Sequence, residues 1–215
     1  MYQTILFDLD GTLTDSGPGI TNSVAYALDK FGITVEDRTS LNPFVGPPLL
    51  ESFARYFGFS EEKGREALGY YREYYQEKGI FENSVYEGIC GLLAELKKAG
   101  KTVVLATSKP EVFAVRIMEH FQLVEYFDVI AGASFDETRV EKSDVIHYAL
   151  SRLDSCEIKE TVMVGDREND VRGARENGLP CIGVLYGYGS REELLTAGAS
   201  CIAESVQDLE ELLIG

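Results

Sequence analysis

The chain is poor in cysteine and has no long apolar run. Cys90, Cys156, Cys181 and Cys201 lie far apart, without Cys-x-x-Cys spacing. This argues against a disulfide framework or a cysteine-based zinc site and favours reduced thiols. No run approaches the ~20 apolar residues of a membrane-spanning helix, and the first residues lack a signal-peptide pattern. We therefore expect a cytoplasmic protein with no membrane partner.

Positive charge is also scarce. The 215 residues include 20 lysines and arginines against 36 aspartates and glutamates, a formal net charge of −16. Such a surface repels phosphate backbones, which argues against nucleic-acid polymers and anionic membranes as partners. A small phosphorylated ligand would need a metal ion or a local basic pocket. The length allows one large domain or a domain with a smaller insertion, and we expect a monomer or a weak homodimer.

Short apolar, β-branched runs bounded by Gly, Asp or Ser recur along most of the chain. They predict strands at residues 5–7, 102–106, 129–131, 161–164 and 181–184. Between the later runs, apolar residues repeat at helical spacing. This alternation predicts an α/β fold with a doubly wound, mostly parallel sheet. Residues 187–193 read Gly-Tyr-Gly-Ser-Arg-Glu-Glu, which predicts a turn and then a capping box that opens a helix.

Residues 17–81 break the alternation. They carry helical patterns near residues 20–31, 49–57 and 61–78 and no convincing strand. This predicts a helical insertion, with residues 1–16 and 82–215 forming the α/β core. Four tyrosines between positions 70 and 75 either pack among these helices or offer a stacking surface for a nucleobase, and we expect packing.

Two carboxylates follow the first predicted strand, where residues 8–13 read Asp-Leu-Asp-Gly-Thr-Leu. Ligands of open α/β sheets bind at this edge. Asp8 and Asp10 could divide a reaction, one attacking as a nucleophile while the other moves a proton. Together they could also bind a hard cation such as Mg²⁺. The alternative is an ordinary acidic turn.

Polar residues also end two later predicted strands. Thr107 and Ser108 follow the strand at 102–106 and precede Pro110, which we place in the first turn of a helix. Hydroxyls and free N–H groups at such a point would bind an anion, although simple helix capping is the alternative. Asp166 and Asp170 follow the strand at 161–164, and their i, i+4 spacing lets both face one cation.

Lys142 lies in the first turn of another predicted helix. A lone lysine at such a position is usually solvated. Here, however, all four segments follow predicted strands at one edge of the sheet. Together they supply what phosphoryl transfer requires: a nucleophile, an acid, cation ligands and donors for the phosphoryl oxygens.

The order of these segments resembles that of the haloacid dehalogenase-like hydrolase superfamily. The matching residues are Asp8-x-Asp10-Gly-Thr, Thr107, Lys142 and Gly165-Asp166-x-x-x-Asp170. Residues 17–81 resemble the small helical cap of that superfamily. Within it, the segments at 46–49, 81–83, 106–110 and 183–189 look most like the phosphoglycolate phosphatase-like and bacterial 5′-nucleotidase-like branch. Many relatives have proline where this chain has Ser143. Because Lys142, which precedes it, keeps the amine, we expect the chemistry to be unchanged.

The resemblance implies a Mg²⁺-dependent phosphatase that acts through an aspartyl-phosphate intermediate. Asp8 would be the nucleophile, and Asp10 would protonate the leaving alcohol and then activate water. The implied Mg²⁺ ligands are the Asp8 carboxylate, the Asp10 backbone carbonyl and Asp166, supported by Asp170. The implied phosphoryl-binding groups are Thr107, Ser108 and Lys142. A small phosphorylated metabolite or a nucleoside monophosphate would be the substrate.

Other functions fit parts of this pattern. A phosphomutase of the same superfamily has the same motifs. A dehalogenase needs neither the second acid nor a metal, so Asp10 and Asp166 argue against it. A phosphorelay receiver also combines acids, a hydroxyl and a lysine on a doubly wound sheet. Its phosphorylated aspartate follows the metal-binding acids, whereas the candidate nucleophile here comes first.

Overall fold

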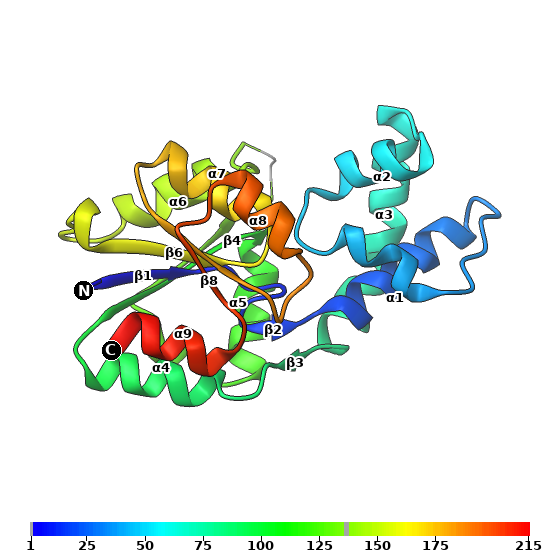
Figure 1. Cartoon of the computed structure of the whole chain (residues 1–215). Helices are drawn as coiled ribbons and strands as arrows, with labels where there is room; N and C mark the ends of the chain where they lie inside the picture. Colours follow the sequence, from blue (N-terminus) through cyan, green and yellow to red (C-terminus); the bar gives the residue numbers. More distant parts are fainter. Residues whose placement is uncertain (1, 136–137) are drawn as a thin grey trace. The chain divides into compact units, whose positions relative to one another are not determined.

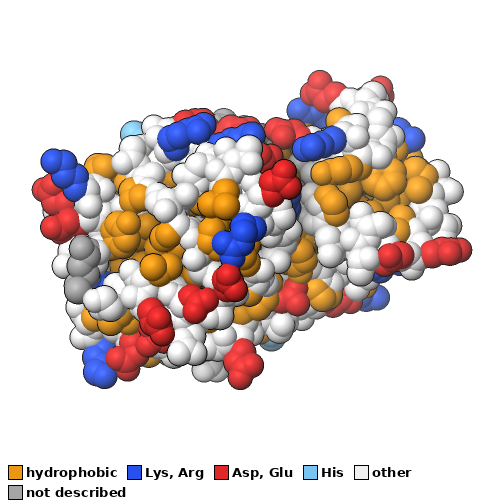
Figure 2. Space-filling model, viewed as in Figure 1, with side chains coloured by type: hydrophobic (Ala, Val, Ile, Leu, Met, Phe, Trp, Pro, Cys, Tyr) orange, Lys and Arg blue, Asp and Glu red, His pale blue; other side chains and the backbone are white. Residues whose placement is uncertain are grey.

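The computed structural model describes residues 2–135 and 138–215. Contacts between Cα atoms divide the chain into two compact units: residues up to Thr14 with Val85–Gly215, and Asp15–Ser84. Within the described ranges, no helix is long and apolar enough to cross a bilayer. Acidic and basic side chains are interspersed over the face shown in Figure 2.

The first unit contains a parallel sheet of six strands in the order β5-β4-β1-β6-β7-β8, as far as the chain is described. The strands are β1 (Thr4–Phe7), β4 (Thr102–Pro110), β5 (Val129–Ala133), β6 (Thr161–Gly165), β7 (Cys181–Val184) and β8 (Cys201–Ala203). The five predicted strands are confirmed, while β8 was not predicted. Because β1 lies between β4 and β6, residues that follow these three strands meet at one edge of the sheet.

Helices cover both faces of this sheet (Figure 1). One face carries α6 (Lys142–Ser151), α7 (Glu168–Glu176) and α8 (Arg191–Ala197); the other carries α4 (Ile89–Lys98), α5 (Glu111–His120) and α9 (Val206–Ile214). Leu6 packs in the core beneath α6 and α7. Its neighbours Ile5 and Phe7 are also fully buried and point to the opposite face, because successive strand side chains alternate. Burial on both faces explains the continuous apolar run and confirms the doubly wound α/β fold.

The second unit is helical. It contains α1 (Gly17–Asp29), α2 (Leu49–Phe57) and α3 (Glu61–Glu77), with the 3₁₀ helices η1 (Arg38–Phe44) and η2 (Gly79–Phe81). Tyr71 and Tyr75 of α3 are buried, and their rings stack with centroids 5.2 Å apart. For these two tyrosines the packing interpretation is confirmed.

Short elements complete the chain. Two further 3₁₀ helices, η3 (Val124–Tyr126) and η4 (Ile158–Glu160), lie in the first unit. The strands β2 (Thr14–Asp15) and β3 (Ser84–Val85) form a two-stranded sheet where the chain passes from one unit to the other.

Candidate active site

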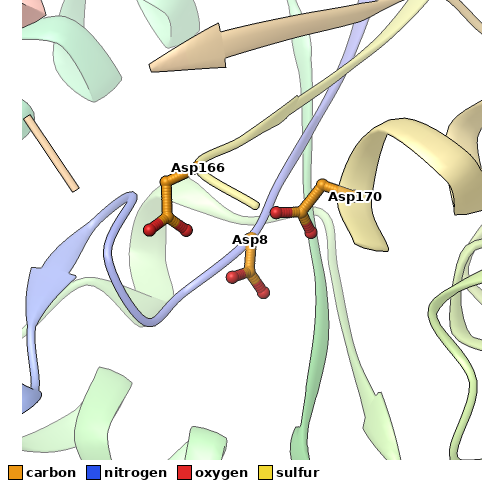
Figure 3. A group of neighbouring side chains, drawn as sticks. All are labelled: Asp8, Asp166 and Asp170. Atoms are coloured by element: carbon orange, nitrogen blue, oxygen red, sulfur yellow. The ribbon is translucent and has the colours of Figure 1, made fainter. Parts of the chain in front are cut away.

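Three buried aspartates meet at the carboxyl edge of the sheet in the first unit. Asp8 directly follows β1, Asp166 directly follows β6, and Asp170 lies in the first turn of α7. A carboxylate oxygen of each lies within 4.8 Å of those of the other two, and Figure 3 shows the three carboxyl groups side by side. The structure therefore brings the predicted segment with Asp8 together with the predicted segment that contains Asp166 and Asp170.

Lys142 joins this group from the start of α6. Its Nζ lies 2.6 Å from Asp8 Oδ1 and 2.8 Å from Asp170 Oδ1, and it donates to the Ala106 carbonyl at 3.1 Å. Burial alone would lower the pKa of Lys142, but the two carboxylates raise it above its ordinary value. The side chain is therefore an ammonium that contacts two carboxylates and a backbone carbonyl.

The Asp166 carboxylate is held by a backbone N–H group, and no lysine contact to it is found in the described part of the chain. The Tyr188 N–H donates to Asp166 Oδ2 at 2.7 Å, while Asp166 Oδ1 is buried without a hydrogen-bond partner among the described residues. Burial raises the pKa of Asp166 well above its usual range, and the nearby charges of Asp170 and Asp8 add to this. Burial likewise raises the pKa of Asp170, to about 6, despite the Lys142 charge.

Glycines leave the room that Asp166 occupies. A Cβ on Gly11, whose φ is +84°, would lie 2.2 Å from Asp166 Oδ2. A Cβ on Gly187 would lie 2.2 Å from the Gly11 oxygen and 2.5 Å from Asp166 Cβ. The interpretation of residues 187–190 as only a turn before a helix was therefore incomplete. Besides leading into α8, this loop encloses the carboxylate through Gly187 and binds it through the Tyr188 N–H.

The segment with Thr107 and Ser108 belongs to β4, which ends at Pro110, the residue directly before α5. β4 continues through Pro110 and α5 begins at Glu111, so the placement of Pro110 inside a helical turn was wrong. Thr107 is buried, and its Oγ1 accepts a hydrogen bond from the Lys109 N–H at 3.2 Å; Ser108 is half-buried.

Lys109 also reaches this edge, although no role was predicted for it from the sequence. Its Nζ lies 3.1 Å from Asp10 Oδ2, and both side chains are less than a tenth exposed. A signal was available: a lysine that directly follows two hydroxyl residues at the end of a buried strand sits where ligands bind.

The charges at this edge leave an excess that a cation would balance. When all are ionised, the four buried carboxyl groups of Asp8, Asp10, Asp166 and Asp170 exceed the two ammonium groups that contact them by two negative charges. The unpartnered Asp166 Oδ1 offers a lone pair next to them. Oxygen donors with this charge excess fit a hard divalent cation such as Mg²⁺.

Comparison with known proteins places this arrangement in a family. The family model for haloacid dehalogenase-like hydrolases matches residues 5–184. The chain belongs to this family. A crystal structure described as a predicted phosphatase from Clostridium acetobutylicum is similar, with a TM-score of 0.96 and 54% identity; the match covers 100% of this chain and 99% of that one.

Two curated relatives also match over most of their length. A 5′-nucleotidase from Pseudomonas aeruginosa is 46% identical over 90% of this chain and 87% of its own. The tyrosine-protein kinase PtkA from Mycobacterium tuberculosis is 40% identical over 98% of this chain and 71% of its own. This member of the haloacid dehalogenase-like family is thus similar to proteins named for different phosphoryl chemistries.

Proposed function

We propose that this chain is a Mg²⁺-dependent phosphate monoester hydrolase that acts through an aspartyl-phosphate on Asp8. The observation that carries the proposal is the buried arrangement in which Lys142 bridges Asp8 and Asp170 beside Asp166. This supports a nucleophile held in place by a cation, next to oxygen ligands for a metal. The family and its relatives named for phosphatase or nucleotidase activity favour the same reaction.

In the first step, an Asp8 carboxylate oxygen attacks phosphorus and the bond from phosphorus to the ester oxygen breaks. Protonated Asp10 gives its proton to that oxygen, so that an alcohol leaves. In the second step, Asp10 takes a proton from water, whose oxygen attacks phosphorus. The bond to Asp8 then breaks, which releases phosphate and restores the Asp8 carboxylate.

Mg²⁺ would be held by the Asp8 carboxylate, the Asp10 backbone carbonyl and Asp166, with Asp170 in support. When bound, it would offset the repulsion between a dianionic ester and these acids. Thr107, the backbone at Ser108 and Lys142 would bind the phosphoryl oxygens. Lys142 suits this task because it stays charged beside two carboxylates.

The substrate we propose is a small phosphorylated metabolite, either a nucleoside monophosphate or a phosphoglycolate-like ester. Relatives named 5′-nucleotidase and phosphoglycolate phosphatase support these two classes. Residues 17–81 would serve as a cap that selects among esters, hinged near residues 14–16 and Asn83, while the phosphoryl group is bound in the α/β core.

A hydrolysis screen tests the proposal. Purified protein would be given nucleoside 5′-monophosphates, phosphoglycolate and p-nitrophenyl phosphate, with Mg²⁺ or with a chelator, and released phosphate would be measured. We expect release with Mg²⁺, loss with the chelator and recovery when Mg²⁺ is added back. Full activity in the chelator would remove the metal from the mechanism. Transfer of the phosphoryl group to a second hydroxyl would identify a mutase. Incubation with ATP and a tyrosine peptide would detect kinase activity of the kind for which PtkA is named.

A further inference from the structure

Lys109 has no part in the mechanism above, although its ammonium group is buried against Asp10. The two side chains are 5% and 9% exposed, and Lys109 Nζ lies 3.1 Å from Asp10 Oδ2. Burying a charged pair carries a desolvation cost that only good geometry offsets. Such a contact fixes where the carboxyl group of Asp10 points.

The end of β4 is shaped to bring Lys109 to this position. The pairing of β4 with β5 shifts register between Thr107 and Pro110, and irregularities of this kind redirect side chains. The Lys109 N–H is held by Thr107 Oγ1. On β5, a Cβ at Gly132 would lie 2.7 Å from the Lys109 carbonyl oxygen, so the absence of a side chain there leaves room for this backbone.

The other buried lysine of the site contacts a different set of acceptors. Lys142 directs its ammonium group to Asp8, Asp170 and the Ala106 carbonyl. The two lysines therefore hold different carboxylates: Lys142 holds the nucleophile and Lys109 holds Asp10.

We propose that Lys109 is a positioning residue that directs the Asp10 carboxyl group toward the leaving oxygen of the substrate. This rests on the proposed role of Asp10 as the acid. Lys109 binds Oδ2, whereas Asp10 Oδ1 is buried and has no hydrogen-bond partner in the described part of the chain. Oδ1 is thus the oxygen left for a substrate.

The leaving group decides how much this positioning matters. An alkoxide is a poor leaving group and needs a proton, while p-nitrophenolate leaves readily without one. The value of kcat/KM reports only the steps up to the first ester cleavage, where Asp10 acts as acid. Loss of Lys109 should therefore lower kcat/KM for an alkyl ester and largely spare the aryl ester. Because Asp10 also activates water in the second step, kcat can fall for both.

The experiment compares Lys109→Met with Lys101→Met. Lys101 is a matched control, since it is also buried but donates to the Tyr2 carbonyl outside the site. For each variant, kcat/KM would be measured with p-nitrophenyl phosphate and with the best alkyl ester from the screen. We expect Lys109→Met to raise the aryl-to-alkyl ratio about tenfold or more. Lys101→Met should leave the ratio unchanged. Lys109→Arg, which keeps the charge, should give a ratio between those of the wild type and Lys109→Met.

Two results would overturn the proposal. An equal loss of kcat/KM for both esters would make Lys109 a phosphoryl-binding group, and unchanged kcat/KM values for both esters would leave it with no role in cleavage. If Lys109→Met does not fold, as judged by circular dichroism, the same ratio is read from Lys109→Gln and Lys109→Arg. Different results would contradict the proposed function itself: no phosphate release by the wild-type protein, or undiminished turnover by Asp8→Asn.

Discussion

Asp166→Asn should make the metal-free protein more stable at neutral pH and should abolish its stabilisation by Mg²⁺. Asp166 is fully buried, and two neighbouring carboxylates, of Asp8 and Asp170, raise the free energy of its ionised form. An asparagine oxygen could still accept the Tyr188 N–H that now binds Asp166 Oδ2. The substitution therefore removes a buried charge and keeps the hydrogen bond.

The pH dependence has a definite sign. Because burial and nearby charges raise the pKa of Asp166 above its ordinary 3.8, folding takes up a proton there. Its contribution to stability is full below the ordinary pKa and is lost as the pH rises through the raised one. Asp170, with its pKa raised to about 6, acts in the same direction. Metal-free wild-type protein should therefore gain stability from these groups as the pH falls through the raised pKa values, that of Asp170 at about 6, and Asp166→Asn should reduce that slope.

The magnitudes follow from the buried charge and from ligand linkage. Removing the uncompensated carboxylate should add about 2 kcal/mol to the free energy of unfolding without metal at pH 7. Mg²⁺ at about 100 times its dissociation constant should add about 2.7 kcal/mol to the wild type. For a chain of this size, that corresponds to an increase in Tm of about 5–10 °C.

Urea unfolding and thermal scans, with Mg²⁺ or with a chelator, provide the measurements. Asp154→Asn is the control because Asp154 is exposed and its charge can be removed at little cost in stability. Two results would contradict a metal site at Asp166: an unchanged wild-type Tm when Mg²⁺ is added, or the same increase in Tm for Asp166→Asn as for the wild type.

Three further predictions concern turnover, metal affinity and selectivity. Asp8→Asn should abolish hydrolysis with the circular dichroism spectrum unchanged, and activity within about tenfold of wild type, near 1.4 kcal/mol of barrier, would contradict its role as the nucleophile. Gly187→Ala should weaken Mg²⁺ binding at least about tenfold by calorimetry, because its Cβ would lie 2.2 Å from a backbone oxygen. The control is Gly91→Ala, because a Cβ at Gly91 in α4 would meet open space. This control should stabilise the fold by about 1 kcal/mol. Substitutions at residues 46–48 should change the ratio of kcat/KM among a nucleotide, phosphoglycolate and p-nitrophenyl phosphate, whereas Lys142→Ala should slow all three alike; identical profiles would contradict this division.

The convergence of the acids could be predicted from the sequence because it follows from a local pattern and a general rule. Asp8 and Asp166 each follow an apolar run that had to be a buried strand, and the carboxyl ends of parallel strands share one edge. The first turn of α6 likewise placed Lys142 at this edge. The three-residue strand β8 was missed because so short a run carries almost no periodic signal.

The contacts that hold these acids could not be predicted, since they depend on how loops fold. The Tyr188 N–H that binds Asp166 is a backbone group, and it leaves no side-chain pattern in the sequence. Glu193 is a second case. Its N–H is capped by Ser190 as the capping pattern implied, but its carboxylate accepts from Arg167 Nε at 2.8 Å and from the Glu168 N–H at 3.0 Å. The glutamate thus ties the start of α8 to the segment that follows Asp166.

The contacts that hold these acids leave little room for substitution around Asp8. Each acid beside the candidate nucleophile is held by a group that is itself fixed: Asp10 by a lysine at an irregular strand end, Asp166 by a loop enclosed through glycine, and Asp170 by Lys142 and the Arg167 N–H. A side chain added among them collides with backbone or carboxylate, so little variation is possible without loss of the geometry. If residues 17–81 select the substrate as proposed, we expect a change of substrate to come from substitutions there and not from changes among these acids.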